Sequence, residues 1–207
     1  AVQKAKGERG VPLTVNVPYG YVKDPENPKH WLVDPEAAAI VKRIFSMCME
    51  GRGPTQIANQ LWADKVLTPT AYKLSHGRST NAPAPEDPYR WDKRAVSLIL
   101  ERREYTGCTV NFKTYTNSIW DKKRHLNPVE NQAIFLDTHE RIIDDDVFEK
   151  VQEIRNQRHR MTRTGKSSIF SGMVYCADCG SKMQYGSSNN RDFSQDFFDC
   201  SLHKKNG

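Results

Sequence analysis

Three of the five cysteines have the spacing of metal ligands. Cys176 and Cys179 form a C-x2-C pair followed by Gly180, and Cys200 comes roughly twenty residues later, a spacing typical of zinc ribbons. Two thiolates at this spacing reach one tetrahedral ion from a single turn, and the glycine allows the tight bend. The segment is small and polar, so bound metal would supply much of its folding free energy. The sequence therefore predicts a closed, structural Zn²⁺ site.

The fourth ligand is left open by the sequence. His203 follows Cys200 at C-x2-H spacing and would complete a Cys3His site, but a fourth cysteine beyond Gly207 in a longer protein is an equal alternative. The odd number of cysteines argues against a closed disulfide framework and indicates a reducing, cytoplasmic compartment. Cys108 lies far away in the sequence, so we do not expect it to bind this ion.

The second candidate for chemistry is the polar face of a short helix predicted over residues 91–103. Asp92 can cap its start, and the spacing of Val96, Ile99 and Leu100 predicts one buried stripe. The opposite face carries Lys93, Arg94, Ser97 and Glu101. Arginine and lysine donate to guanine in a major groove, and free helix amides meet phosphate. An ordinary amphipathic helix with a solvated basic face explains the same pattern, so this helix alone does not distinguish DNA binding from a solvated surface.

Two further segments offer contacts to a nucleic acid. Residues 1–33 contain prolines and a basic start, which predicts an extended arm able to follow a minor groove, with a frayed terminus as the simpler alternative. Thr55 and Gln56 begin another helix and can touch phosphate. The full set of candidate DNA contacts is Lys4, Lys6, Arg9, Thr55, Gln56, Arg90, Lys93, Arg94, Ser97 and Arg102.

These residues need helices to position them. Asp-Pro-Glu at residues 34–36 marks a helix start, and apolar residues at helical spacing continue to Cys48. A second helix starts at Pro54 and is expected to bury Ile57, Ala58, Leu61 and Trp62. With the helix over 91–103 these form a helix-turn-helix variant, in which a long proline-rich connection over 66–90 replaces the tight turn. The three helices together favour DNA binding over a solvated face.

The second half of the chain has a different pattern. Residues 105–112 alternate like a strand, residues 118–120 are expected to pair with them, and residues 121–133 are predicted to be a loop. Three aspartates at 144–146 precede a periodic apolar run, which favours a helix N-terminus over a metal or catalytic cluster. His139 has no support in the sequence as a catalytic base. Short strands are predicted over residues 169–175, 183–185 and 193–199.

The charge balance favours an anionic partner. The chain of 207 residues has a formal net charge of +6 and 37% hydrophobic residues. A basic balance suits nucleic acid or an anionic membrane surface. The sequence contains no apolar run of membrane-spanning length and no visible secretory signal. Because it begins with Ala1 and its first residues look like the end of something longer, we expect a piece of a larger protein.

Several motifs, in order, resemble one protein family. They are Pro-Tyr-Gly-Tyr at 18–21, Val-Asp-Pro-Glu-Ala at 33–37, Ile40, Val41, Ile44, Phe45, Gly51, Ile57, Ala58, Trp91, Val96, Ile99, Leu100, Tyr-Thr-Gly at 105–107, Ile142, Ile143, Phe148, Val151 and Gln152. This set covers most of residues 15–155 and resembles the recombinase domain of large serine recombinases. The cysteine segment over 176–200 is similar to the zinc ribbon that follows in that family.

The resemblance implies an α+β fold, with a mainly helical recombinase domain that contains a helix-turn-helix-like unit and a small sheet, followed by a small β zinc ribbon. The implied boundaries are a basic arm and entry segment at 1–33, a DNA-binding domain at 34–160 and the ribbon at 161–207, whose completeness stays open. Carried onto matching positions, the arm approaches the minor groove, and the helix over 91–103 enters the major groove.

The resemblance also implies a role in site-specific recombination for phages, integrative elements or transposons. Family members bind double-stranded attachment or element-end sites, with a dimer on each site and a tetramer joining two sites. The family's N-terminal catalytic domain with its serine nucleophile, and its long coiled-coil insertion, are missing from this sequence. We therefore expect this chain to be monomeric in solution, to bind DNA and to cut nothing.

A hypothesis from another class is a zinc-ribbon protein-interaction scaffold whose basic charge is incidental. It predicts partner binding that is indifferent to DNA sequence, whereas the recombinase hypothesis predicts preference for one duplex and a steep salt dependence. An RNA-binding module lacks an evident sheet face with stacking aromatics. A free-standing hydrolase lacks a nucleophile–base pair. Replacement of Lys93 and Arg94 by alanine separates the first two hypotheses.

Overall fold

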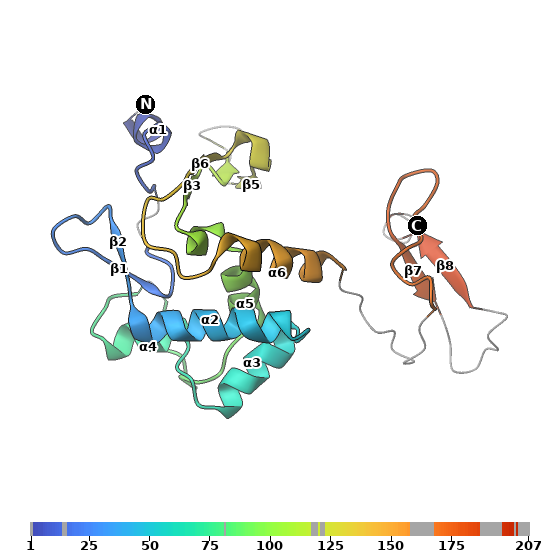
Figure 1. Cartoon of the computed structure of the whole chain (residues 1–207), viewed down its shortest axis with the longest axis horizontal. Helices are drawn as coiled ribbons and strands as arrows, with labels where there is room; N and C mark the ends of the chain where they lie inside the picture. Colours follow the sequence, from blue (N-terminus) through green and yellow to red (C-terminus); the bar gives the residue numbers. More distant parts are fainter. Residues whose placement is uncertain are drawn as a thin grey trace. The chain divides into compact units, whose positions relative to one another are not determined.

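The computed structural model describes residues 2–13, 16–80, 82–116, 120, 123–157, 168–186, 196–200 and 202. The chain divides into two compact units, Ala1–Ile154 and Arg155–Gly207, which are described separately (Figure 1). The first unit is mainly helical with small antiparallel sheets, and the second is a small β unit. The predicted α+β class is confirmed.

Three helices form the core of the first unit. They are α2 (Pro35–Met49), α3 (Pro54–Ala63) and α5 (Lys93–Glu101), and α3 and α5 each pack against α2 and against each other. Their inward faces supply the fully buried side chains Val41, Ile44, Phe45, Ile57, Leu61, Val96 and Leu100. The helical periodicity in the sequence therefore predicted these elements and their buried faces correctly, with one exception in α3 that is described below.

The start of α2 differs in detail from its prediction. Pro35 is the first residue of the helix, as expected, but the Asp34 carboxylate makes no capping hydrogen bond. It accepts instead from the Tyr72 hydroxyl at 2.9 Å and from Arg78 at 3.1 Å. Asp34 is buried, so these two donors supply the partners that its charge requires. The residue joins the long connection to the helical core.

The connection over 66–90 contains a helix that the sequence did not predict. Helix α4 (Pro69–Ser75) is capped by Thr68, whose Oγ1 accepts from the Ala71 amide at 3.3 Å. Tyr72 is buried and gives α4 its place in the core. The end of the connection is fixed by the Trp91 indole, which donates to the Val66 carbonyl at 3.0 Å. The connection is therefore tied down at both ends.

The prediction of an extended arm over residues 1–33 is wrong for most of its length. Helix α1 spans Val2–Glu8, and strands β1 (Tyr21–Lys23) and β2 (Trp31–Val33) form an antiparallel hairpin. Tyr19, Tyr21 and Trp31 are all buried in the core. The apolar and aromatic side chains of this segment decided its structure, because their burial outweighs the extended preference that the prolines confer.

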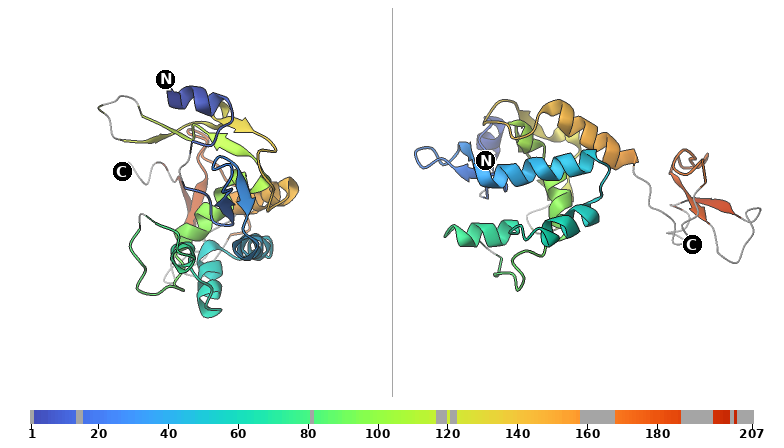
Figure 2. Two further views of the ribbon diagram at one scale, coloured as in Figure 1. Left: turned by 90° about the vertical axis from the view of Figure 1, so that its left-hand side faces the viewer. Right: turned by 60° about the horizontal axis from the view of Figure 1, so that its bottom comes forward.

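Two more small sheets and a helix complete the first unit. Strand β3 (Thr109–Asn111) pairs with β6 (Ala133–Phe135), and β4 (Thr114–Tyr115) pairs with β5 (His125–Leu126). Two short 3-10 helices are η1 (Arg103–Thr106) and η2 (Val129–Asn131). Helix α6 (Asp145–Gln157) lies beside α2, as the ribbons in Figure 2 show. The ring of Phe148 packs near that of Phe45 of α2, with ring centroids 6.3 Å apart.

The sequence placed the strands of this region only roughly. Tyr105 belongs to η1 and buries its ring, with the hydroxyl donating to the Tyr19 carbonyl at 2.8 Å. The true partner of β3 is β6, which lies within and beyond the segment predicted as a loop. Residues 118 and 119 of the expected pairing strand lie outside the described residues. The aspartates at 144–146 do precede and begin α6, as predicted.

The second unit is a two-stranded antiparallel ribbon. Strands β7 (Met183–Gly186) and β8 (Phe197–Cys200) pair in the register Met183↔Cys200. The strand predicted over 169–175 is wrong: these residues form turns, and only Tyr175 makes an isolated bridge, to Lys182. Residues 193–195, predicted as strand, lie outside the described part. Among the described residues, every helix is too short or too polar to cross a lipid bilayer.

Candidate nucleic-acid interface and metal centre

Helix α5 presents the two faces that its sequence indicates. The Asp92 carboxylate accepts from the Arg94 amide at 3.0 Å and so caps the helix start. Val96, Ile99 and Leu100 are buried against α2 and α3. Lys93 and Arg94 are exposed and Ser97 is half-buried. The apolar face of α5 is therefore held rigidly by the core, while the basic face points to solvent.

The two cations at the start of α5 are not paired with an acid in the described part of the chain, although Glu101 lies on the same face of the helix. Neither Lys93 nor Arg94 forms an ion pair with any residue that the structure describes. Leu98 on the same side is 45% exposed, although the helical spacing gives no sign of a functional role for it. Unpaired cations beside an exposed apolar side chain suit a groove that offers both acceptors and thymine methyl groups.

Arg90, just before α5, is supported by a cluster that the sequence did not predict. Trp62 is 43% exposed rather than buried, and its indole donates to Asp87 Oδ2 at 2.9 Å. The Arg90 guanidinium lies 6.0 Å from the centre of the Trp62 ring, a cation–π distance. Asp87 also accepts from the Tyr89 amide at 2.9 Å, which fixes the turn. Trp62, which is distant in the sequence, and Asp87, three residues before Arg90, thus orient Arg90.

Asp87 is held as a carboxylate. The Tyr89 amide, followed by the indole of Trp62 and the charge of Lys65, keeps the pKa of its carboxyl below the ordinary value. Lys65 itself lies 5.5 Å from the centre of the Tyr89 ring. The one sign in the sequence that Trp62 is exposed is its position at the edge of the apolar stripe of α3.

The other predicted contacts lie in different surroundings. Gln56 caps α3, because its Oε1 accepts from the Gly53 amide at 2.9 Å, whereas Thr55 is exposed. Arg102 is the half-buried residue after α5 and lies near Lys73, whose pKa is lowered by burial and then by the charge of Arg102. Arg102 thus lies beside a second cation, and its contact with DNA stays a prediction.

The three cations of the N-terminal segment lie in and just after α1. Lys4 is exposed and pairs with Glu8 at 3.9 Å, while Lys6 and Arg9 are exposed. Asn111 of β3 holds this segment: its Nδ2 donates to the Gly7 carbonyl at 3.1 Å and the Val11 carbonyl at 3.0 Å. Its Oδ1 accepts from the Leu13 amide at 3.2 Å. The position of Arg9 is thus set by a contact about a hundred residues away, for which the sequence carries no signal.

His139 is a structural histidine, consistent with its lack of support as a catalytic base. Its Nε2 lies 2.8 Å from the Glu104 carbonyl oxygen, and its ring contacts Tyr21 and Trp31. Burial lowers the pKa of the imidazole, so it is neutral at pH 7 and Nε2 carries the proton that it donates. Cys108 is buried in the first unit, with its thiol donating to the Arg103 carbonyl at 3.2 Å.

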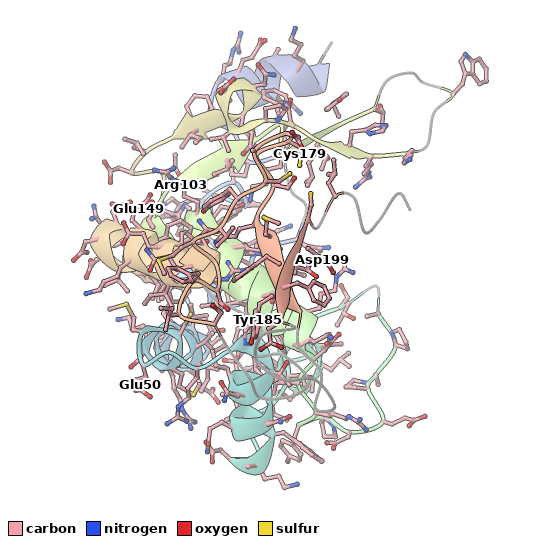
Figure 3. The ribbon with its side chains drawn as sticks, turned by 90° about the vertical axis from the view of Figure 1, so that its right-hand side faces the viewer. Glu50, Arg103, Glu149, Cys179, Tyr185 and Asp199 are labelled. Carbon is pink, nitrogen blue, oxygen red and sulfur yellow. The ribbon has the colours of Figure 1, made fainter. Side chains whose placement is uncertain are left out.

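The cysteines of the ribbon converge as their spacing predicts. The sulfur atoms of Cys176, Cys179 and Cys200 all lie within 4.8 Å of one another, and Cys179 Sγ and Cys200 Sγ are 3.4 Å apart. Gly180 has a φ of +65° and its amide donates to the Cys176 carbonyl at 2.9 Å, which closes the turn. Cys179 lies away from Tyr185 and Asp199, which mark the two strands (Figure 3).

The donor set fits zinc. Tetrahedral Zn²⁺ with bonds of about 2.3 Å to sulfur places its thiolates roughly 3.8 Å apart, close to the separations found here. Hydrogen bonding from Ser181, first through its side chain and then through its backbone, lowers the pKa of the Cys179 thiol to about 7. This favours the thiolate that a metal requires. His203, the candidate fourth ligand, lies outside the described residues.

Two family models match the chain. The model described as Recombinase matches residues 35–158, and the model described as Recombinase zinc beta ribbon domain matches residues 169–207. Among curated proteins, the uncharacterized protein YefB of Bacillus subtilis (strain 168) is 32% identical over 96 residues, or 46% of this chain and 32% of that protein. The match thus spans about a third of the relative.

Two solved structures share the fold. One, described as "Sequence Requirements of the Listeria innocua prophage attP site", has a TM-score of 0.52 and 16% identity, and the match covers 99% of this chain and 74% of that one. The other, "Crystal Structure of a LSR-DNA Complex", has the same TM-score and identity and covers 99% of this chain and 56% of that one. The family models and the order of the two units agree with the resemblance seen in the sequence. The chain belongs to the recombinase family, with a recombinase domain followed by a recombinase zinc beta ribbon domain.

Proposed function

We propose that this chain is the part of a serine recombinase that recognises double-stranded DNA at attachment or element-end sites. The observation that carries the proposal is the outward face of α5, where Lys93 and Arg94 are exposed and unpaired among the described residues. The solved structures of similar fold include a complex with DNA and a study of a prophage attP site, which supports this choice of partner. The role in recombination follows from the family.

In this proposal α5 enters the major groove as the recognition helix of a helix-turn-helix variant. The rigid packing of Val96, Ile99 and Leu100 fixes the helix, so that the side chains of the basic face reach base edges without further ordering. Arg94 and Lys93 donate to guanine, and Leu98 meets a thymine methyl group. Arg90, oriented by Trp62, contacts the backbone beside the groove.

The ribbon supplies a second DNA-binding module on the same half-site. A structural Zn²⁺ held by Cys176, Cys179, Cys200 and a fourth ligand such as His203 maintains its fold, and it performs no chemistry on DNA. Two linked modules raise affinity through effective concentration, and the spacing between them selects the sites that fit. We assign to this chain recognition and not strand cleavage. The whole protein would bind as a dimer on each site and a tetramer at synapsis, and this chain alone as a monomer.

One observation favours a second candidate function for the ribbon unit. Its turn over 169–175 exposes several apolar side chains, namely Ile169, Phe170, Met173 and Tyr175. Exposed apolar clusters rimmed by polar residues mark protein-interaction surfaces. In this alternative the ribbon serves as a protein-interaction scaffold, and its loss leaves DNA affinity unchanged.

The test is a fluorescence anisotropy titration at two salt concentrations. It compares the end sequence of the parent element with a scrambled duplex, each with and without a zinc chelator. We expect a preference of about a hundredfold or more for the native end, a steep salt dependence, and weaker binding after chelation. Equal affinity for both duplexes contradicts sequence-specific recognition. An unchanged affinity after chelation favours the scaffold role of the ribbon.

A further inference from the structure

A cavity of about 260 Å³ in the first unit lies between four segments of the chain. They are the residues that follow α1, the loop that joins β1 to β2, the start of β3 at Thr109, and the segment at 138–139 before α6. The cavity is lined by Arg9, Gly10, Val11, Pro12, Asn27, Lys29, His30, Thr109, Thr138 and His139. Two of these segments bring basic side chains to its rim.

The side chains that line this cavity carry a net positive charge. Neither Arg9 nor Lys29 has an ion pair or side-chain hydrogen bond with any residue in the described part of the chain. Acidic side chains lie near the cavity but outside its lining: Asp24 faces His30 with Nδ1 and Oδ2 3.5 Å apart, Glu26 belongs to the same loop, and Glu8 precedes Arg9 and pairs with Lys4. No carboxylate belongs to the lining. Two uncompensated cations converging on one opening favour an anion there.

The walls of the cavity are fixed before any ligand binds. Asn111 holds the segment of Arg9 through the carbonyls of Gly7 and Val11. In the hairpin loop, the Asn27 side chain accepts from the Lys29 amide at 3.3 Å, and the Asn27 carbonyl accepts from the His30 amide at 2.8 Å. Both cations are thus attached to an ordered backbone, which reduces the entropy lost on binding.

The inner wall is polar and neutral. The hydroxyl oxygens of Thr109 and Thr138 lie 2.7 Å apart, and the Thr138 hydroxyl is 3.0 Å from Nδ1 of His139. His139 adds no charge, because its burial lowers the pKa of the ring. The hydroxyl hydrogens of both threonines are used within the wall, so the attraction for phosphate oxygens comes from the N–H donors and the charge of Arg9 and Lys29 at the rim.

We infer that this cavity binds one phosphodiester group of duplex DNA, held between Arg9 and Lys29. Arginine suits two phosphate oxygens at once, and lysine adds a point charge from the opposite side. The inference rests on the proposed function and extends it: the loop between β1 and β2 becomes a DNA-contacting element beside the basic arm. Nothing in the sequence pattern singled out Lys29 or His30.

The test uses the whole chain and three variants, Arg9→Ala, Lys29→Ala and the double variant. Lys150→Ala is the matched control, because Lys150 is an exposed lysine of α6 outside the cavity. Anisotropy titrations with the native-end duplex at several salt concentrations give the affinity and its salt slope, and thermal melts check that each variant is folded. Both substituted side chains are at the surface, so the melting temperatures should match the control.

We expect Arg9→Ala and Lys29→Ala each to weaken binding about three- to tenfold and to reduce the salt slope by up to about one. Because both cations hold one phosphate, the double variant should lose much less than the product of the two effects. If the two effects multiply, the shared phosphate is refuted. If Lys29→Ala equals Lys150→Ala while the unaltered chain binds DNA, the cavity inference alone fails. If the unaltered chain binds no duplex, the proposed function fails with it.

Discussion

The substitution Asn111→Ala should release the segment that carries Arg9. Asn111 is 3% exposed and makes three hydrogen bonds to it, through the Gly7 and Val11 carbonyls and the Leu13 amide. At a net value of about 0.5–1.5 kcal/mol for each bond, their loss shifts the free energy of docking by about 1.5–4.5 kcal/mol, or roughly ten- to two-thousandfold in the open population. The core helices do not depend on these bonds, so the first unit should stay folded.

Limited trypsin digestion measures this opening directly. Cleavage after Lys6 and Arg9 follows the population of the open form when opening and closing are fast. We expect cleavage there to accelerate at least tenfold in Asn111→Ala, and DNA affinity to fall because only the docked fraction presents Arg9 correctly. Asn156→Ala, an exposed asparagine of α6, is the control. Cleavage at the control rate in Asn111→Ala would refute the docking of this segment by Asn111.

Three further predictions concern the metal, the support of Arg90 and pH. Chelation of zinc or the substitution Cys179→Ser should unfold the ribbon unit, while the melting transition of the first unit persists in circular dichroism and calorimetry. Loss of both transitions together would contradict the independent folding of the two units. Trp62→Ala should weaken DNA binding about three- to tenfold but have little further effect in an Arg90→Ala background, whereas fully additive losses would separate the two residues. Burial lowers the pKa of His139 in the folded state, so the unfolded chain takes up this proton first as the pH falls. The contribution of His139 to the free energy of unfolding should therefore be fully present above about pH 6.5 and be lost as the pH drops toward the depressed pKa. His139→Phe should reduce this dependence of the unfolding free energy on pH, as measured by urea titrations.

The helical core was predictable because its signals are local. The start of α2 at Pro35, the cap of α5 by Asp92 and the buried stripe of Val96, Ile99 and Leu100 all follow from residues within two turns of each other. Cys176 and Cys179 were predictable for the same reason, since a C-x2-C turn sets its own geometry, whereas Cys200 was predicted from the spacing typical of zinc ribbons and is placed by the pairing of β7 with β8. Local spacing also gave the basic face of α5.

The rest depended on contacts between distant residues. Strand β3 pairs with β6 across a long intervening segment, and Tyr21 donates to the Glu140 carbonyl at 2.9 Å. Contacts of this kind leave no periodic pattern in strands as short as these. The fold of residues 1–33 was therefore not visible in the sequence, and the prolines before β1 suggested an extended arm instead. The supports of the interface, Trp62 for Arg90 and Asn111 for Arg9, are likewise set by tertiary packing that one sequence does not encode locally.

The central claim is that α5 reads DNA sequence, and Arg94→Ala tests it most directly. Its affinity for the native-end duplex and for a scrambled duplex should be measured at one salt concentration beside Lys150→Ala. The account predicts that Arg94→Ala loses about 1–3 kcal/mol on the native duplex and much less on the scrambled one, so that the specificity ratio falls roughly ten- to a hundredfold. An unchanged ratio, with affinity lost equally on both duplexes or on neither, would contradict the assignment of α5 as the recognition helix.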